Sequence, residues 1–216
     1  EIRTPLNSIL GFSKLVVDVE ISYEKKREFS NMIKSNGEQL LSIINNLLDF
    51  SLIETGQFKL VSKEFDVDKL LKELRKEYHH CAVDRGLEMK ISETIGDELS
   101  FVHSDIARVR QVLRNLINNS VKFTKEGFIE IGHYRIEDGV VIYVKDTGIG
   151  ISNDFRNQIF KSFTQAEKTK SRKFSGNGLG LALSKKIIEK LGGKIWFESE
   201  AGKGSVFYIL LPYKVS

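Results

Sequence analysis

The sequence predicts an α+β protein: a helical hairpin that dimerises into a four-helix bundle, followed by an α/β sandwich with a mixed sheet. The first observation is a heptad repeat of apolar residues between about residues 23 and 55. The second is a change, beyond residue 57, to short strands and amphipathic helices. The third is a pair of glycine-rich turns at residues 146–151 and 176–182. We therefore predict two domains, residues 1–56 and 57–216.

The composition is that of an ordinary globular protein, with 41% hydrophobic and 29% charged residues. No apolar run approaches the roughly 20 residues that span a bilayer, so we expect a soluble segment that reaches a membrane only through an upstream region. The net charge of +4 is too small to indicate nucleic-acid binding. The single cysteine, Cys81, favours a reducing compartment, and we expect a cytoplasmic location and a packed Cys81 side chain.

The predicted hairpin consists of a helix over residues 2–16, a polar break at 18–22 and a helix of roughly 30 residues, about 45 Å long. The heptad seam of the long helix has Asn36 in place of one apolar residue, and the neighbouring Gly37 costs about 1 kcal/mol relative to Ala. Two helices bury only one face each, which favours dimerisation. The apolar seam positions are Phe29, Ile33, Leu40, Ile43, Leu47 and Phe50.

The second domain alternates strands and helices. Asp105 is a candidate N-cap for an amphipathic helix that continues to about residue 124. The other predicted helices cover residues 67–84 and 179–191. The predicted strands cover residues 58–61, 87–91, 128–135, 140–145, 194–198 and 205–211, with turns at 137–139 and 201–204.

The two glycine clusters, "DTGIGI" and "GNGLGLA", do not match the common phosphate-binding motifs. The second lacks the Lys-Ser/Thr of a Walker A loop and does not follow a strand as a Rossmann fingerprint does. It does directly precede a helix, where backbone N–H groups and the helix dipole favour an anion. A purely structural turn is an equally good interpretation of the glycines taken alone.

A polar stripe interrupts the helix that follows Asp105. Asn115, Asn119 and Lys122 are spaced by four and three residues and therefore share one helix face. Amide oxygens can ligate Mg²⁺, whose other sites hold water and phosphate. For any one of these residues, a solvated helix face is the alternative.

These motifs together resemble the sensor histidine kinase family. "NLINNSVKFT" looks like its N box, "DTGIGI" and "GNGLGLA" like its two glycine boxes, "IFKSFTQ" like its F box, and "EIRTPL" like the end of its H box. The resemblance extends from residue 1 almost to the C-terminus. It implies a dimeric phosphotransfer hairpin joined to an ATP-binding domain of the Bergerat fold.

The resemblance also implies roles for single residues. Asn119 would chelate an Mg²⁺ ion that bridges the ATP phosphates, with Asn115 alongside, and Lys122 would contact phosphate. Asp146 would accept a hydrogen bond from the adenine amino group. The implied glycine roles are close approach to the adenine ring for Gly148 and Gly150, and opening of the phosphate-facing helix for Gly176, Gly178 and Gly180.

The segment between the glycine clusters, residues 152–175, would form a lid over bound ATP. Its tip is cationic, which suits a cover for triphosphate, although a solvated loop is the alternative. Phe160 and Phe163 would anchor the lid on the domain. The basic residues of the tip are Lys168, Lys170, Arg172 and Lys173.

In the family's H box the phosphorylated histidine immediately precedes the residue that matches Glu1. The sequence as given therefore lacks the acceptor, and because it also lacks an initiator Met we expect a truncated fragment. Glu1 would serve as general base for that histidine, and Thr4 would orient water for dephosphorylation of a response regulator. Structural roles are expected for the four histidines present, His79, His80, His103 and His133.

The predicted function is ATP- and Mg²⁺-dependent autophosphorylation of a bundle histidine, transfer to a response-regulator aspartate, and phosphatase activity. The expected partners are a second copy of the chain and a response regulator, with no nucleic acid. The alternatives are a non-catalytic ATP-binding dimeric scaffold, a chaperone- or topoisomerase-like relative, which would lack the "EIRTPL" hairpin, and nucleic-acid binding through the basic lid.

Overall fold

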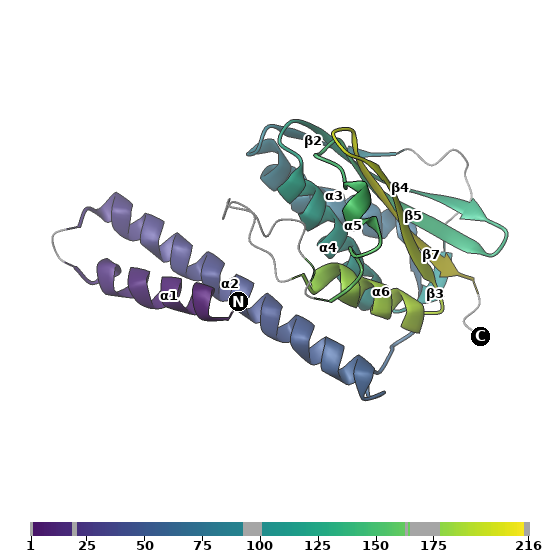
Figure 1. Ribbon diagram of the computed structural model, residues 1–216, viewed down its shortest axis with the longest axis horizontal. Helices are drawn as coiled ribbons and strands as arrows, with labels where there is room; N and C mark the ends of the chain where they lie inside the picture. The colour runs from purple at the N-terminus through teal and green to yellow at the C-terminus, as the bar shows by residue number, and fades with distance from the viewer. Residues whose placement is uncertain (1, 19–20, 93–100, 163, 165–177, 214–216) are drawn as a thin grey trace. The chain divides into compact units, whose positions relative to one another are not determined.

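The computed structural model describes residues 2–18, 21–92, 101–162, 164 and 178–213 (Figure 1). The chain divides into two compact units, Glu1–Phe58 and Lys59–Ser216. The first is all helical and the second contains both sheets of the described chain. The predicted fold class, a helical region followed by an α/β domain with a mixed sheet, is thereby confirmed.

The first unit is the predicted hairpin, with α1 at Arg3–Val16 and α2 at Tyr23–Glu54. Ser22 caps α2 by accepting a hydrogen bond from the Lys25 N–H. The rings of Phe12 and Phe29 stack with centroids 5.5 Å apart and join the two helices. Helix α2 continues through Gly37 without a break, so the low helical propensity of this glycine is tolerated. A Cβ at Gly37 would meet nothing within 4 Å.

The hairpin leaves many apolar side chains in solvent. Leu47, a predicted seam residue, is 51% exposed, whereas Ile43 is buried. Exposed leucines and isoleucines at this density leave much apolar surface that another chain could cover. The exposed large apolar residues of α2 are Tyr23, Met32, Leu41, Ile44, Leu47, Leu48 and Leu52.

The second unit contains a five-stranded sheet with the strand order β2-β4-β5-β7-β6. Strands β2 and β4 are parallel and the remaining neighbours are antiparallel, so the sheet is mixed, as predicted. The strands are β2 (Leu87–Ile91), β4 (Gly127–Ile136), β5 (Gly139–Asp146), β6 (Lys194–Glu200) and β7 (Gly204–Pro212).

A separate two-stranded sheet pairs β1 (Lys63–Asp66) antiparallel with β3 (Phe101–Ser104). The prediction of a strand at residues 58–61 is wrong, because the first strand begins later, and β3 was missed. The Val61 N–H donates to the Asp105 carboxylate at 2.9 Å instead of to a neighbouring strand. The Val61 N–H, which the local pattern assigned to a sheet, is therefore hydrogen-bonded to a side chain 44 residues away.

Helices α3 (Val67–Val83), α4 (Ile106–Phe123) and α6 (Gly180–Lys190) cover one face of the five-stranded sheet (Figure 1). Antiparallel pairing aligns Ile131 with Val144 and Phe207 on that face, and all three are buried. The short α5 (Asn153–Arg156) follows β5. The largest fully buried helix side chains are Leu70, Leu71, Leu74, Leu113, Leu116, Ile117, Ile187 and Ile188.

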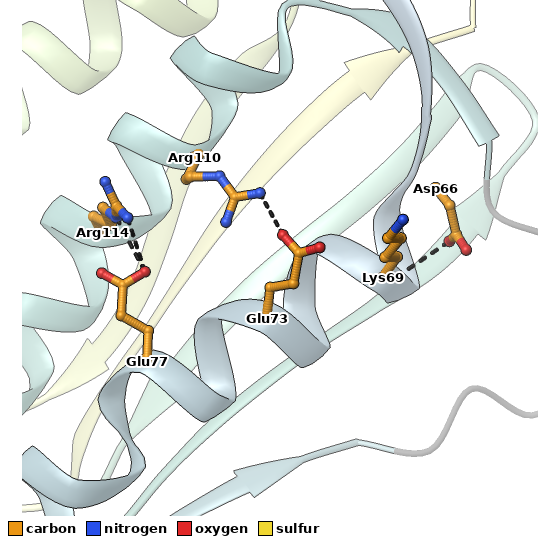
Figure 2. Close-up of polar contacts among 6 residues, drawn as sticks. All are labelled: Asp66, Lys69, Glu73, Glu77, Arg110 and Arg114. Carbon is orange, nitrogen blue, oxygen red and sulfur yellow. Dashed lines mark hydrogen bonds and ion pairs between the residues drawn. The ribbon is translucent and has the colours of Figure 1, made fainter.

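Helices α3 and α4 also meet through two ion pairs. Figure 2 shows Glu73 and Glu77, one turn apart on α3, facing Arg110 and Arg114 on α4. The Arg110–Glu73 and Arg114–Glu77 pairs measure 2.6 and 2.9 Å. The hydrogen bond from Arg110 lowers the pKa of the Glu73 carboxyl group. Both pairs join α3 to α4 between partly exposed side chains.

Two single-residue expectations have opposite outcomes. Cys81 is exposed, so the prediction of a packed side chain is wrong: Ala82, the next residue of α3, is buried. His133 is packed as expected, with its Nδ1 3.7 Å from the Asp68 carboxylate. Burial lowers the pKa of His133, against the opposing charges of Asp68 and Asp66.

Candidate functional site

The site is built around Asp146, the last residue of β5, which is only 7% exposed. Its pairing with Ile129 and Ser205 places it in the sheet row that faces the helices. Oδ1 accepts the Gly148 N–H at 2.9 Å, and Oδ2 accepts the Ser120 hydroxyl at 3.0 Å. A buried carboxylate with these two donors still has lone pairs for a further donor.

Burial raises the pKa of Asp146 because desolvation disfavours the charged form. The hydrogen bonds from Gly148, Ser120 and the Ser205 backbone act in the opposite direction but do not outweigh it. Burying the charged form of Asp146 therefore costs folding free energy, and a carboxyl group with a perturbed pKa is typical of functional positions.

Helix α4 presents the predicted polar stripe beside this carboxylate, since Ser120 follows Asn119 directly. The Asn115 Nδ2 donates to the Ser184 hydroxyl on α6 at 2.9 Å. Within the part of the chain that the structure describes, no hydrogen bond engages the half-buried Asn119 carboxamide. The Lys122 ammonium lies 4.6 Å from the centre of the Phe123 ring. Of the two stripe asparagines, Asn119 is thus the one whose carboxamide has no hydrogen-bond partner among the described residues.

The first glycine turn is held by protein backbone. A Cβ on Gly148 would lie 2.6 Å from the Phe123 carbonyl oxygen, and one on Gly150, whose φ is +66°, would overlap the Glu200 carbonyl. The Ile149 carbonyl accepts the Gly202 N–H at 2.8 Å. These contacts account for both glycines without a bound ring, so their predicted approach to adenine stays a prediction.

Ser199 on β6 fastens the beginning of the predicted lid. Its hydroxyl accepts the Ile151 N–H at 2.8 Å, and its carbonyl accepts from the Arg156 guanidinium. Further along, the Phe160 and Phe197 rings meet edge to face with centroids 6.0 Å apart. Phe160 therefore packs on the domain as predicted.

The second glycine cluster enters the described chain at Gly178, whose φ is +62°. Helix α6 begins two residues later at Gly180, after the buried Leu179. A Cβ on Gly180 would overlap the Asn115 Oδ1, so the start of α6 lies directly against the polar stripe of α4.

The other predicted site residues are distributed as follows. Thr4 lies exposed on α1, and its carbonyl accepts the Ser8 hydroxyl at 3.1 Å. Thr4 belongs to the first unit, and the stripe belongs to the second. Outside the described residues lie Glu1, Lys170, Arg172 and Gly176, together with the lid residues Phe163, Lys168 and Lys173.

Sequence reasoning missed three serines that contact this region: Ser120, Ser184 and Ser199. Ser120 and Ser184 occupy buried positions of α4 and α6 among apolar neighbours. A hydroxyl at a core position needs a partner, and that signal could have identified both. Ser199 had no comparable signal, because its partners are backbone groups after β5 and on β7, and the Ser205 hydroxyl.

Among the described residues, no group of three or more His, Cys, Asp and Glu side chains could hold a metal ion. No helix among the same residues has the length and apolar content to cross a membrane.

Two family models match the chain, one at each end, and leave residues 57–103 unmatched. Residues 1–56 match the His Kinase A (phospho-acceptor) domain, and residues 104–215 match the histidine kinase-, DNA gyrase B- and HSP90-like ATPase family. The autoinducer 2 sensor kinase/phosphatase LuxQ of Vibrio cholerae is 38% identical over 219 residues, covering 100% of this chain and 25% of LuxQ. The sensor histidine kinase GacS of Pseudomonas protegens is 40% identical, covering 98% of this chain and 23% of GacS.

Solved structures agree with these matches. Full-length ShkA in complex with AMPPNP superposes with a TM-score of 0.74 at 29% identity, over 99% of this chain and 44% of ShkA. Histidine kinase ThkA in complex with response regulator protein TrrA gives a TM-score of 0.73 at 27% identity, over 99% of this chain and 59% of that one.

Two features define a histidine kinase-like ATPase core. The first is a helical hairpin followed by a mixed sheet with three helices on one face. The second is a buried carboxylate beside an asparagine stripe. The chain belongs to the sensor histidine kinases, as the catalytic core made of the phospho-acceptor and ATPase domains. It spans about a quarter of the length of the curated relatives that it matches.

Proposed function

We propose that this chain is the ATP-dependent kinase core of a longer dimeric sensor. In that protein a bundle histidine takes the γ-phosphoryl group of ATP, and an aspartate of a response regulator receives it. The observation that carries the proposal is the convergence of a buried acceptor, Asp146, with the α4 stripe and the start of α6. Phosphatase activity is part of the proposal because LuxQ is named a sensor kinase/phosphatase.

The residues present fit a purine nucleotide. Asp146 offers an acceptor-only group that suits a donor such as the adenine amino group. The start of α6 offers phosphate the positive end of a helix dipole and backbone N–H groups that have no partner within the helix. ShkA, a relative of the same fold, is described in complex with AMPPNP.

The residues also fit Mg²⁺, through Asn119. Its carboxamide is the amide of the stripe that no protein group engages among the described residues, and amide oxygens are ordinary Mg²⁺ ligands. A bound Mg²⁺ would neutralise charge on the transferred phosphoryl group. Lys122, in the same turn of α4, would add a second positive charge toward phosphate.

The catalytic roles of Glu1 and Thr4 belong to the same proposal and rest on the H-box resemblance. The exposed position of Thr4 on α1 is compatible with contact to a response regulator, and ThkA is known in complex with one. The exposed apolar residues of α2 support homodimerisation. We place the core in the cytoplasm, where ATP and response regulators are found.

The central test is a phosphorylation assay with γ-labelled ATP on the parent chain that includes the residue before Glu1. We expect a labelled protein whose phosphate is acid-labile and base-stable, as a phosphohistidine is, and transfer of that label to a receiver domain. ATP binding without any labelled protein would contradict the kinase proposal and would indicate the non-catalytic scaffold instead.

A second test addresses Mg²⁺. Asn119→Ala should weaken ATP binding in Mg²⁺ by at least about 30-fold, the equivalent of about 2 kcal/mol. With EDTA in place of Mg²⁺, the variant and the wild type should bind ATP alike. Asn118→Ala is the matched control, because Asn118 is exposed on the side of α4 where it bonds to Tyr78. Calorimetric affinities that are unchanged in Mg²⁺ would overturn the Asn119 assignment.

A further inference from the structure

A polar contact lies inside the otherwise apolar interface between α4 and α6. Ser184 is 2% exposed and is surrounded on its own helix by the buried Ala182, Leu183, Ile187 and Ile188. Its hydroxyl accepts the Asn115 Nδ2 at 2.9 Å, although the two residues are 69 positions apart in the chain. A buried serine that receives a side-chain donor from another helix couples the two helices through a directional bond.

The same asparagine also contacts the first residue of α6. Ser184 follows Gly180 by four residues, so both lie on one face of the helix, one turn apart. A Cβ on Gly180 would overlap the Asn115 Oδ1, which means that the carboxamide fills the space that a side chain would occupy. Asn115 therefore meets α6 through both groups of its carboxamide, Nδ2 by a hydrogen bond to Ser184 and Oδ1 by lying close to Gly180.

We infer that Ser184 is a positioning residue for the nucleotide site, and that Asn115 acts through it by joining the start of α6 to α4 and does not ligate Mg²⁺. This inference rests on the proposed ATP site. The influence of a helix N-terminus on an anion falls off within one turn, so a small displacement of α6 weakens its hold on phosphate. The bond to Ser184 is placed one turn from that N-terminus.

Removing the hydroxyl has a defined consequence. In Ser184→Ala the Asn115 Nδ2 loses its partner inside a buried interface, and an unpaired buried donor is unfavourable. The carboxamide then turns toward another acceptor. Its Oδ1 no longer packs against Gly180, in the space that a side chain at that position would fill. Adenine recognition by Asp146 does not depend on this contact, because its own partners are Ser120, Gly148 and the Ser205 backbone.

The test compares ATP with adenosine, which shares the base and lacks the phosphates. NMR titrations, which tolerate weak binding, give dissociation constants for the whole chain and its variants. We expect Ser184→Ala to weaken ATP binding about fivefold to tenfold and adenosine binding by less than about twofold. Ser184→Thr, which keeps the hydroxyl, should restore ATP affinity to within about twofold of wild type.

Ser104→Ala is the matched control. Ser104 is also a buried serine, but its hydroxyl has no hydrogen-bond partner in the described chain and lies on β3. We expect this variant to bind both ATP and adenosine as the wild type does. Thermal unfolding of all variants identifies any that do not fold, and the ratio of the ATP and adenosine constants remains interpretable at reduced stability.

Three results would overturn the inference. Ser184→Ala with wild-type ATP affinity would show that the bond does not position the site. Equal weakening of ATP and adenosine binding would show a general structural role only. Loss of the Mg²⁺ dependence of ATP binding in Asn115→Ala, while Ser184→Ala keeps that Mg²⁺ dependence unchanged, would make Asn115 a direct ligand. A wild-type chain that binds neither ATP nor adenosine would instead contradict the proposed function.

Discussion

At the scale of single residues, Asp146 shows a conflict between stability and recognition. Its burial raises the pKa of the carboxyl group, so the native state binds a proton more readily than the unfolded chain. The stability that follows from this shift is present below the unfolded-state pKa and is lost as the pH rises through the native pKa. At neutral pH an ionised Asp146 therefore lowers the free energy of unfolding.

We predict that Asp146→Asn binds ATP at least about tenfold more weakly, because a charge-assisted hydrogen bond to the base is lost. The same variant without nucleotide should unfold at a higher temperature than wild type at pH 7. Calorimetric binding and thermal unfolding measure the two effects.

The pH series supplies the control for this prediction. The stability advantage of Asp146→Asn should shrink as the pH is lowered, because burial raises the pKa of the Asp146 carboxyl group and the native wild type gains that proton before the unfolded chain does. Equal wild-type affinity for ATP and for GTP, whose base has no amino group at the corresponding position, would argue against Asp146 as the reader of adenine. An Asp146→Asn variant that is less stable than the wild type but binds ATP with unchanged affinity would also argue against that role.

At the scale of elements, the start of α4 depends on a single side chain. Asp105 caps the helix by accepting the Ala107 and Arg108 N–H groups at 3.0 and 3.1 Å, and it also accepts the Val61 N–H. We predict that Asp105→Ala lowers the free energy of unfolding by about 2–3 kcal/mol, the sum of a lost cap and a lost interior bond. Asp66→Ala, which removes only the cap of α3, should cost about 1 kcal/mol in the same urea titration.

If Asp105→Ala and Asp66→Ala destabilise equally, the bond to Val61 contributes nothing and the explanation for the displaced first strand is wrong. A larger effect of Asp105→Ala would show that this carboxylate organises the connection before β1 as well as the helix.

The contacts between α3 and α4 allow a comparison of ionic with apolar packing. We predict that Glu77→Gln changes the free energy of unfolding by less than about 1 kcal/mol, because its ion pair is solvent-exposed (Figure 2). This small effect should vanish in 1 M NaCl. Leu74→Ala, on the buried face of α3, should cost about 2–5 kcal/mol at either salt concentration. A salt-dependent loss of several kcal/mol for Glu77→Gln would contradict this ranking.

At the scale of the whole molecule, the two units have different requirements. The second unit buries its own core, and ThkA's catalytic domain alone superposes on 71% of this chain with a TM-score of 0.62. The hairpin leaves much apolar surface of α2 exposed, which favours its burial by a partner chain.

We therefore predict that the intact chain is a dimer and that residues 59–216 alone form a monomer with unchanged ATP affinity. Leu47→Lys should weaken dimerisation by at least about tenfold, since about 1.5–3 kcal/mol follows from burying one leucine. Ser42→Lys is the control, an exposed polar position on the same helix. Sedimentation equilibrium measures the oligomeric state of the intact chain, the fragment and the two variants, and calorimetry measures the ATP affinity of the fragment. A monomeric intact chain would contradict the proposed bundle.

Local patterns predicted most of the fold. Amphipathic spacing located α3 and α4 to within a residue or two, and the turn residues 137–139 located the β4–β5 hairpin. The patterns failed where a distant group decided the conformation, as with Val61 and Asp105. They also missed β3, a strand of four residues that exists only because it pairs with β1.

The candidate site divides in the same way. Motif order indicated Asp146, Asn115, Asn119 and the glycines, because each belongs to a short contiguous stretch. The difference between the two asparagines was invisible, since both have the same residue type on the same helix face. Ser184 distinguishes them, and it lies 69 positions from Asn115.

By itself, the sequence determined the family, the order of most elements and the chemical types at the nucleotide site, because these depend on local spacing and residue type. Only the tertiary structure decided that the Asn115 carboxamide bonds to Ser184 and that the Asn119 carboxamide has no partner among the described residues. It also decided which carbonyl groups a side chain at Gly148 or Gly150 would overlap, and that burial raises the pKa of Asp146. Those properties arise from distances between distant parts of the chain and from exclusion of water, neither of which any local pattern contains.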